Sequence, residues 1–196
     1  MMKISCQCGK LRGEIERPEE LRGLRIVCMC KDCQRFARAL GNSKNILDEN
    51  GGLEVVPVFP KLLRITSGQE YLKCLKNTPQ SGTFRWYASC CKSPLANSLS
   101  GKEGYIGLVT QCLSEEDKAS LGPVRARANG ESGIPPLPKG TSKKFPLKWI
   151  FIMIYLIVRG QIQGWKQPNP FFDQNNHPLF EPEIIIAPKT SKADNY

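Results

Sequence analysis

The stretch Leu24-Arg25-Ile26-Val27-Cys28-Met29-Cys30-Lys31-Asp32-Cys33 joins a short apolar run to three closely spaced cysteines. Residues 24–27 are typical of a strand. Residues 33–40 place their apolar side chains on one helical face and stop at Gly41, which predicts a helix. We therefore expect the three cysteines where a strand turns into a helix, an arrangement that supplies three sulfur ligands from six residues.

Further short strands are expected on both sides of this stretch, from Ile4 to about Val109. Residues 11–16 alternate apolar and charged side chains, the period-two pattern of a strand with one face in water. Turn residues such as Gly51-Gly52 separate the other apolar runs. The remaining expected strands are residues 53–56, 62–66, 83–87 and 105–109. Residues 1–113 are thus predicted to form a mainly β domain.

A helical and irregular extension is expected after this domain. Ser114 precedes three carboxylates, which predicts a short helix that stops near Gly122-Pro123. Residues 125–144 are rich in Gly, Pro, Ser and Lys and show no apolar periodicity, so residues 114–144 are interpreted as a short helix and a linker or long surface loop.

The most apolar segment, residues 145–158, opens the last part of the chain, residues 145–196. It is shorter than the ~20 apolar residues of a membrane span. We expect a helix packed on the β domain and closed by Gly160, with a membrane-surface helix flanked by basic residues as the alternative. The tail is expected to fold back over the domain through Phe171, Phe172, Leu179, Phe180, Ile184 and Ile186.

Composition limits the chemistry further. The chain has 196 residues and a net charge of +10, and its one histidine, His177, excludes any site that needs two imidazoles. No apolar signal-peptide core follows Met1, so we expect a cytoplasmic, reducing location in which clustered cysteines are metal ligands rather than disulfides. No glycine-rich phosphate loop indicates a nucleotide cofactor.

Seven of the nine cysteines fall into three clusters. Tetrahedral zinc is bound by thiolates, and one or two Zn²⁺ ions are expected here; inert buried thiols and an iron–sulfur cluster are the alternatives. Cys74 and Cys112 lie among apolar neighbours and are interpreted as buried, inert thiols, and His177 as a turn residue. The candidate metal ligands are Cys6, Cys8, Cys28, Cys30, Cys33, Cys90 and Cys91.

Three blocks of this sequence resemble the glutathione-dependent formaldehyde-activating enzyme and centromere protein V family. They are Cys6-Gln7-Cys8-Gly9, Cys28-Met29-Cys30-Lys31-Asp32-Cys33-Gln34 and the stretch from Arg85 to Leu95, and the turn Leu47–Gly52 is similar too. The resemblance covers roughly residues 4–110. It implies a twisted β fold called the β-tent, a structural zinc shared by the first and third blocks, and a zinc credited with the chemistry in the middle block.

The third block departs from the family pattern. The family has a cysteine where this chain has Ala88 and a glycine where it has Lys92, so only Cys91 matches a family ligand. Cys90 either bends towards the first block as its fourth ligand or faces the middle block and closes that site. The pattern resembles an uncharacterised side branch of the family.

The sequence is compatible with two main functions and with a third option. The resemblance favours an enzyme, a carbon–sulfur lyase or transferase acting on an adduct of a small thiol such as S-hydroxymethylglutathione, in which zinc at Cys28, Cys30 and Cys33 binds the thiol and deprotonates it. The alternative is a structural zinc module that binds nucleic acid or an acidic partner through its positive charge, through residues 83–87 and through residues 125–144. Peripheral membrane contact through residues 149–158 is a third option.

Overall fold

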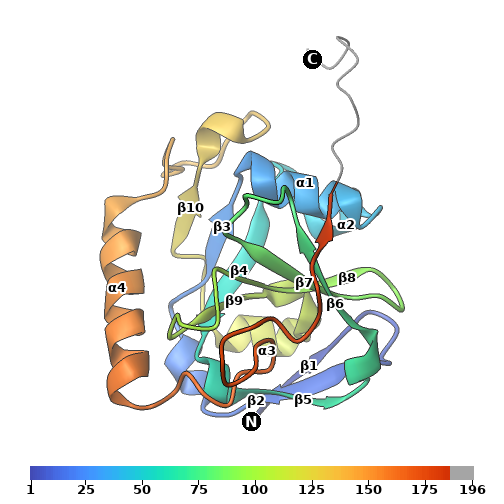
Figure 1. Ribbon diagram of the computed structural model, residues 1–196. Helices are drawn as coiled ribbons and strands as arrows, with labels where there is room; N and C mark the ends of the chain where they lie inside the picture. The colour runs from blue at the N-terminus through green and yellow to red at the C-terminus, as the bar shows by residue number, and fades with distance from the viewer. Residues whose placement is uncertain (186–196) are drawn as a thin grey trace.

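The computed structural model describes residues 1–185 and, within them, eleven strands in two sheets together with four α-helices (Figure 1). The predicted mainly β fold with a C-terminal helix is confirmed. Short 3-10 helices join several elements: Pro18–Leu21, Pro60–Leu62, Gln69–Tyr71, Thr110–Cys112 and Gly130–Ser132.

The smaller sheet is antiparallel and has the order β1 (Met2–Ser5), β2 (Arg12–Ile15) and β5 (Leu63–Ser67). Gly13 and Ile15 are buried on β2, as the alternating pattern predicts. A Cβ atom at Gly13 would lie 2.4 Å from the Arg64 carbonyl oxygen, so only glycine fits between these strands.

The larger sheet has eight strands in the order β10, β3, β4, β9, β8, β7, β6 and β11. Its inner neighbours are antiparallel, whereas the two edge strands, β10 and β11, pair in parallel with β3 and β6. The bounds are β3 (Ile26–Cys28), β4 (Leu53–Val58), β6 (Leu72–Lys76), β7 (Phe84–Ala88), β8 (Ser93–Ser98), β9 (Ile106–Val109), β10 (Ala126–Ala128) and β11 (Glu183–Ile184).

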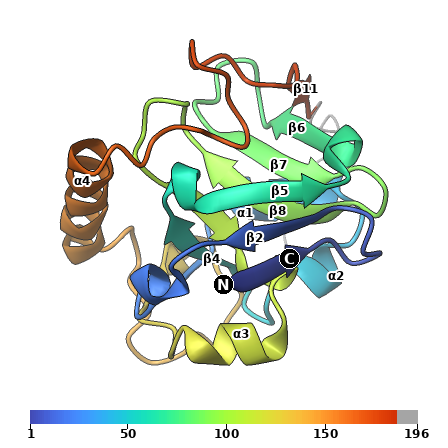
Figure 2. The ribbon, with the colours of Figure 1, turned by 90° about the horizontal axis from the view of Figure 1, so that it is seen from below.

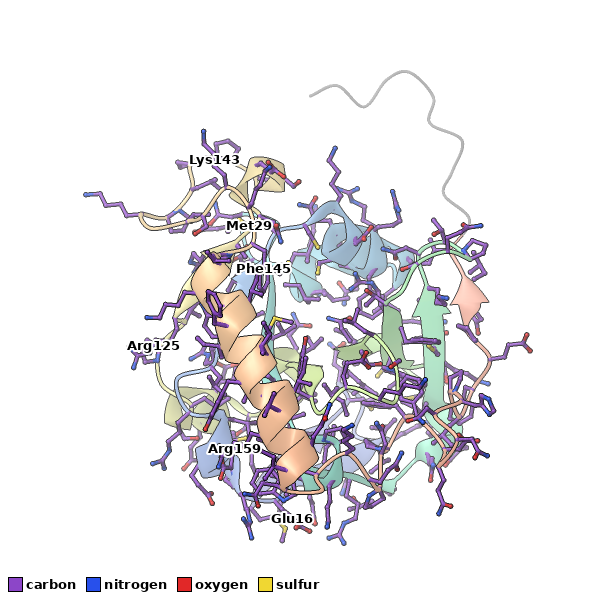
Figure 3. The ribbon with its side chains drawn as sticks, turned by 60° about the vertical axis from the view of Figure 1, so that its left-hand side comes forward. Glu16, Met29, Arg125, Lys143, Phe145 and Arg159 are labelled. Carbon is purple, nitrogen blue, oxygen red and sulfur yellow. The ribbon has the colours of Figure 1, made fainter. Side chains whose placement is uncertain are left out.

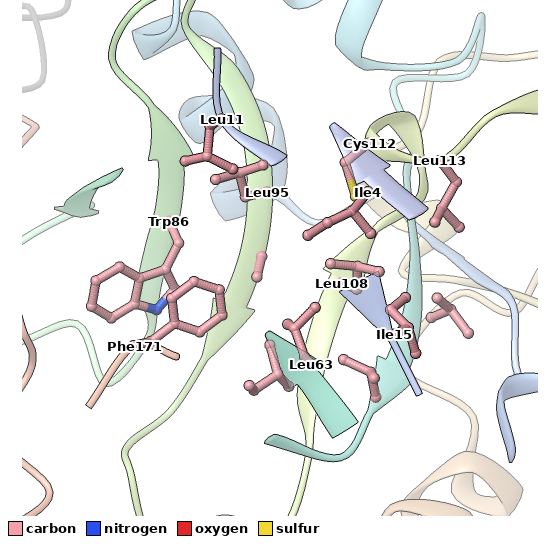
Figure 4. Packing of buried hydrophobic residues seen from close by; sticks show 14 of the residues in the cluster. Ile4, Leu11, Ile15, Leu63, Trp86, Leu95, Leu108, Cys112, Leu113 and Phe171 are labelled. Carbon is pink, nitrogen blue, oxygen red and sulfur yellow. The ribbon is translucent and has the colours of Figure 1, made fainter. Parts of the chain in front are cut away.

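The main core lies where the smaller sheet covers the larger one. Figure 2 shows β2 and β5 crossing in front of β7 and β8, and buried side chains of both sheets meet between them. Ile15 and Leu63 face Leu108 in this core, and Trp86 stacks on Phe171 with ring centroids 4.7 Å apart (Figure 4). The C-terminal tail is therefore part of the core and fixes the sheets that carry the cysteines.

Three helices lie close to the sheets. α1 (Lys31–Ala39) and α2 (Ser43–Ile46) follow β3, and Gly41 adopts a φ of 78° just after α1, as expected for the residue that ends a helix. α3 (Glu115–Ser120) starts at Ser114, whose hydroxyl accepts a hydrogen bond from the Asp117 amide at 3.0 Å. The predicted short helix is confirmed.

The segment 125–144, interpreted from its composition as a linker or long surface loop, contains a strand. Residues Ala126–Ala128 form β10 and pair in parallel with β3, which brings this segment beside the middle cysteines. The side chain of Asn50 donates hydrogen bonds to the carbonyl oxygens of Ile134 and Pro136, both at 2.9 Å. Composition misleads here because these contacts are made with residues far away in the sequence.

The last helix, α4 (Leu147–Ile162), packs along the edge of the larger sheet. Its Trp149 contacts β3 and β10, and its Leu156 packs against Phe59. The prediction that Gly160 closes the helix is wrong: Gly160 lies within α4, and the helix stops before Gly164, whose φ is 64°. Gly160 is required instead for close packing, because a Cβ atom there would lie 2.7 Å from the carbonyl oxygen of Gly104.

The tail folds back over the domain, as expected. Phe171 and Phe172 are fully buried beside Trp86, and Phe180 is partly buried against the same core. Leu179 and Ile184 remain 40% exposed, and Ile186 lies outside the described residues.

Candidate metal centres

The middle cysteines meet at the junction of β3 and α1. Cys28 ends the strand, Cys30 precedes the helix as its N-cap, and Cys33 lies in the first turn. Their three sulfur atoms lie within 4.8 Å of one another. The predicted convergence is confirmed, and we call this set the three-cysteine centre.

Two side chains that the sequence did not assign to a metal centre contact this one. Asn129 Nδ2 donates to Cys28 Sγ at 3.2 Å, and Arg85 Nη1 lies 3.9 Å from Cys33 Sγ. The Cys33 amide also donates to Cys30 Sγ at 3.4 Å, a hydrogen bond at the start of a helix that favours a thiolate. No short-range pattern could have revealed Asn129, because the β3–β10 pairing brings it from 101 residues away.

Hydrogen bonds among the three thiols shift their pKa values in opposite directions. Hydrogen bonds from Cys30 and Cys33, with a further one from Asn129, hold the pKa of Cys28 well below its usual range. The same hydrogen bonds to Cys28, together with burial, raise the pKa values of Cys30 and Cys33, and the Arg85 charge partly offsets this at Cys33. Because soft thiolates are the ligands that zinc prefers, the donor set fits that metal.

Arg85 is unusual because it is a buried cation. It is 3% exposed, its Nη1 donates to Asn97 Oδ1 at 3.0 Å, and its guanidinium lies 5.4 Å from the ring centroid of Phe36. Its Nε has no hydrogen-bond partner within residues 1–185, where no carboxylate pairs with it either. Buried charges normally have a counter-charge, and here the sulfur atoms of the centre are the nearest candidates.

A cavity of about 270 Å³ lies against the three-cysteine centre. Cys28, Cys33 and Arg85 line it, and Trp149 and Met153 of α4 also face it. Most of its surface is apolar, apart from Arg85 and a few polar groups such as Glu103. The centre is thus accessible to a small molecule on one side.

The remaining clustered cysteines form a second centre, the four-cysteine centre: Cys6, Cys8, Cys90 and Cys91. All four sulfur atoms lie within 4.8 Å of one another. The Sγ of Cys90 lies 3.7 Å from that of Cys6, 3.4 Å from that of Cys8 and 3.8 Å from that of Cys91. These are the separations expected of four thiolates around one zinc ion.

A bend in the backbone allows two adjacent cysteines to point at one centre. β7 ends at the buried Ala88, and a turn over residues 89–92 replaces the regular strand. Lys92 adopts a φ of 56°, a left-handed conformation that glycine adopts most readily. Cys90 thus lies with Cys6, Cys8 and Cys91 at the four-cysteine centre, and the alternative that it faces the three-cysteine centre is wrong.

Neighbouring groups also polarise the four-cysteine centre. The Leu11 amide donates to Cys6 Sγ at 3.3 Å, and the Ser93 hydroxyl lies 3.1 Å from Cys91 Sγ. Burial acts to raise the pKa of Cys91, but hydrogen bonds from Ser93 and from the Cys8 backbone outweigh it and lower this pKa to about 6. Burial and hydrogen bonds to Cys8 and Cys6 raise the pKa of Cys90.

The other candidate residues lie away from both centres. Cys74 and Cys112 are buried, and burial raises the pKa of each to about 12, in line with inert thiols. His177 is exposed in a turn, where its amide donates to Asp173 Oδ1 at 2.8 Å.

The surface expected to contact nucleic acid is only partly available. Arg85, Trp86 and Tyr87 of β7 are at most 3% exposed, so this strand belongs to the core and offers no platform for stacking bases. In the segment 125–144, Arg127 pairs with Asp48 at 2.9 Å. The basic and aromatic residues 83–87 therefore do not support the nucleic-acid hypothesis.

A family model described as "Family of unknown function (DUF6151)" matches residues 1–183, nearly the whole chain. This chain belongs to the DUF6151 family. No curated protein matches this DUF6151 chain. Among solved structures, a crystal structure of a Rhodobacter sphaeroides protein is similar at 20% identity, with 63% of this chain and 97% of that chain covered and a TM-score of 0.43. The residues of the two centres themselves therefore carry the functional argument.

Proposed function

We propose that this DUF6151 protein binds zinc at both centres and cleaves or forms a carbon–sulfur bond in an adduct of a small thiol, such as S-hydroxymethylglutathione. The four-cysteine centre is the structural site in this proposal, and the three-cysteine centre is the reactive one. The cytoplasm, where such thiols are abundant and disulfides are rare, is the proposed location.

The observation that carries the proposal is the placement of Cys90. With Cys90 at the four-cysteine centre, the other centre has three cysteine ligands and faces a cavity. Structural zinc sites usually have four protein ligands, whereas catalytic sites keep one position for water or substrate. A bound zinc ion with such a position would bind the substrate sulfur and favour its thiolate form.

Arg85 supports the same assignment through its charge. A divalent ion with three thiolates carries one net negative charge, and the guanidinium of Arg85 lies 3.9 Å from Cys33 Sγ to balance it. Arg85 also lines the cavity, where its guanidinium could donate to an anionic or carbonyl oxygen of a ligand. Asn129 orients the Cys28 side chain through its hydrogen bond to the sulfur, as residues that hydrogen-bond to metal ligands commonly do.

The proposed reaction is balanced without an oxidant or reductant. In the cleavage direction the bond between carbon and sulfur breaks and its electron pair stays on sulfur. The hydroxyl proton passes to solvent as the carbonyl group forms, so that the products are a thiolate, a proton and formaldehyde. The apolar walls of the cavity, among them Trp149 and Met153, exclude water from the reacting carbon.

The test is an exchange measurement on zinc-loaded protein. Formaldehyde and glutathione form the adduct slowly in buffer, and NMR exchange spectroscopy measures the rates of formation and breakdown. We expect the protein to raise both rates and Cys30→Ser to abolish the increase. Cys74→Ser is the matched control because it changes a cysteine outside both centres.

The non-catalytic alternative gives a different result. If zinc at the three-cysteine centre already has four protein ligands, no thiol will enter its coordination sphere and the exchange rates will equal those in buffer. That result would leave a structural zinc module and reject the lyase.

A further inference from the structure

The outward face of α4 is strongly apolar. Phe151 is 64% exposed and Ile162 is 77% exposed. At 100° per residue the exposed apolar positions span about 140° of the helix, opposite the buried Trp149 and Leu156. We call these seven residues the α4 face: Leu147, Ile150, Phe151, Ile154, Tyr155, Val158 and Ile162.

This face is not what a surface helix usually presents to water. Surface helices carry polar residues on the side away from the core, and a helix that is apolar all round is normally covered. Nothing in residues 1–185 covers the α4 face, which runs along one side of the molecule (Figure 3).

The charged side chains of the segment that contains α4 are all positive, although two acidic residues lie beside it: Glu20, and Glu131, whose amide donates to the Lys143 carbonyl oxygen. No Asp or Glu occurs from Ser132 to Phe172, whereas six Lys and Arg do: Lys139, Lys143, Lys144, Lys148, Arg159 and Lys166. Lys143, Lys144 and Lys148 are exposed at the start of the helix and form no ion pair among the described residues. Arg159, near the other end, pairs with Glu20 at 2.6 Å, so the free positive charge is concentrated at the N-terminal end.

We propose that the α4 face and the lysines at its start dock this protein on an anionic phospholipid surface. No helix within the described residues has the length and apolarity to cross a bilayer, so α4 lies in the interfacial plane. Apolar side chains enter the acyl boundary while lysines contact the anionic headgroups.

The charge pattern selects this occupant over a second copy of the chain. Two copies packed through their α4 faces with parallel helices would bring two sets of unpaired lysines together, and antiparallel helices would place each set beside the Arg159 and Lys166 end of the other copy. Residues 132–172 supply no carboxylate to neutralise these charges in either arrangement. An anionic membrane offers both an apolar layer and the opposite charge.

The test is vesicle flotation with the full chain. Vesicles of phosphatidylcholine alone are compared with vesicles in which part of the lipid is phosphatidylserine. We expect binding to the anionic vesicles, and Phe151→Ser with Ile154→Ser to weaken it about a hundredfold because two large apolar side chains no longer insert. Leu179→Ser, at an apolar position outside α4 that is 40% exposed, is the control and should bind normally.

Lysine variants test the electrostatic contribution to vesicle binding. Lys143→Gln with Lys144→Gln should weaken binding to anionic vesicles about thirtyfold. The same change at Lys3 and Lys102, both exposed, serves as the charge-matched control. Equal loss in both pairs would show a general charge effect and overturn the docking surface.

Two other outcomes would also reject the proposal. One is absence of binding to anionic vesicles at low salt by a folded chain, as judged by circular dichroism. The other is a dimer in sedimentation velocity that Phe151→Ser with Ile154→Ser dissociates, because the α4 face would then be covered by a second copy.

Discussion

Replacing Gly160 by alanine should destabilise the protein, although alanine is the better helix former. Gly160 lies inside α4, at the point where the helix approaches the loop at Gly104. A Cβ atom at this position would lie 2.7 Å from the Gly104 carbonyl oxygen and 3.0 Å from its Cα. Both are backbone atoms, so the clash is relieved only if the loop or the helix moves.

The magnitude follows from two opposing effects. The Gly→Ala change favours a helix interior by about 1 kcal/mol. Overpacking costs about 1–3 kcal/mol, and contacts as short as these place the cost at the upper end of that range. We expect a net loss of about 1–2 kcal/mol, which lowers the Tm of a chain of this size by roughly 2–8 °C.

Thermal unfolding followed by circular dichroism measures this change under one fixed metal concentration. Gln161→Ala is the control: it is exposed on the same helix, and its stability should change by less than about 0.5 kcal/mol. A Tm for Gly160→Ala equal to or above that of the parent chain would refute the close approach of α4 to Gly104.

Further predictions concern the core, the thiols and Arg85. Phe171→Ala should cost about 3–5 kcal/mol in urea unfolding, because it removes a buried ring stacked on Trp86, and a loss below about 1 kcal/mol would mean that the tail is not part of the core. Cys74 and Cys112 should resist iodoacetamide in the native protein between about pH 7 and pH 9, since burial raises their pKa values to about 12 and keeps both thiols neutral; mass spectrometry of peptides that finds them labelled before unfolding would contradict this. Arg85→Met should lower zinc affinity at the three-cysteine centre about 10–100-fold in competition with a chelator, while urea unfolding of the metal-free chain is no easier than in the parent, because the variant removes a buried charge. Arg125→Met, at an exposed arginine, should leave zinc affinity unchanged.

Local pattern was enough to predict the elements whose partners lie nearby in the chain. The alternation on β2 and the one-sided apolar face of α1 are both present in the structure. Three cysteines within six residues at a strand-to-helix junction are close in space because they are close in the chain. The Ser114 cap is a similarly local signal.

Features that depend on long-range contacts were missed. Residues 126–128 have no strand pattern of their own and become β10 only by pairing with β3, which places Asn129 beside Cys28. Arginine is normally expected at the surface, but Arg85 is buried. Its guanidinium donates a hydrogen bond to Asn97 and lies beside Cys33 of the three-cysteine centre. Gly160 resembled a helix end because the pattern could not show that the loop at Gly104 requires a residue without a side chain there.

The central claim is that the seven clustered cysteines form two zinc centres with unequal numbers of protein ligands. Native mass spectrometry counts the zinc ions, and X-ray absorption on the same sample gives the average number of sulfur atoms around a zinc ion. We expect two ions per chain with an average between three and four sulfurs, rising to four when glutathione is added. A chain that binds no zinc, or one whose zinc ions have four sulfurs before any thiol is added, would contradict the account.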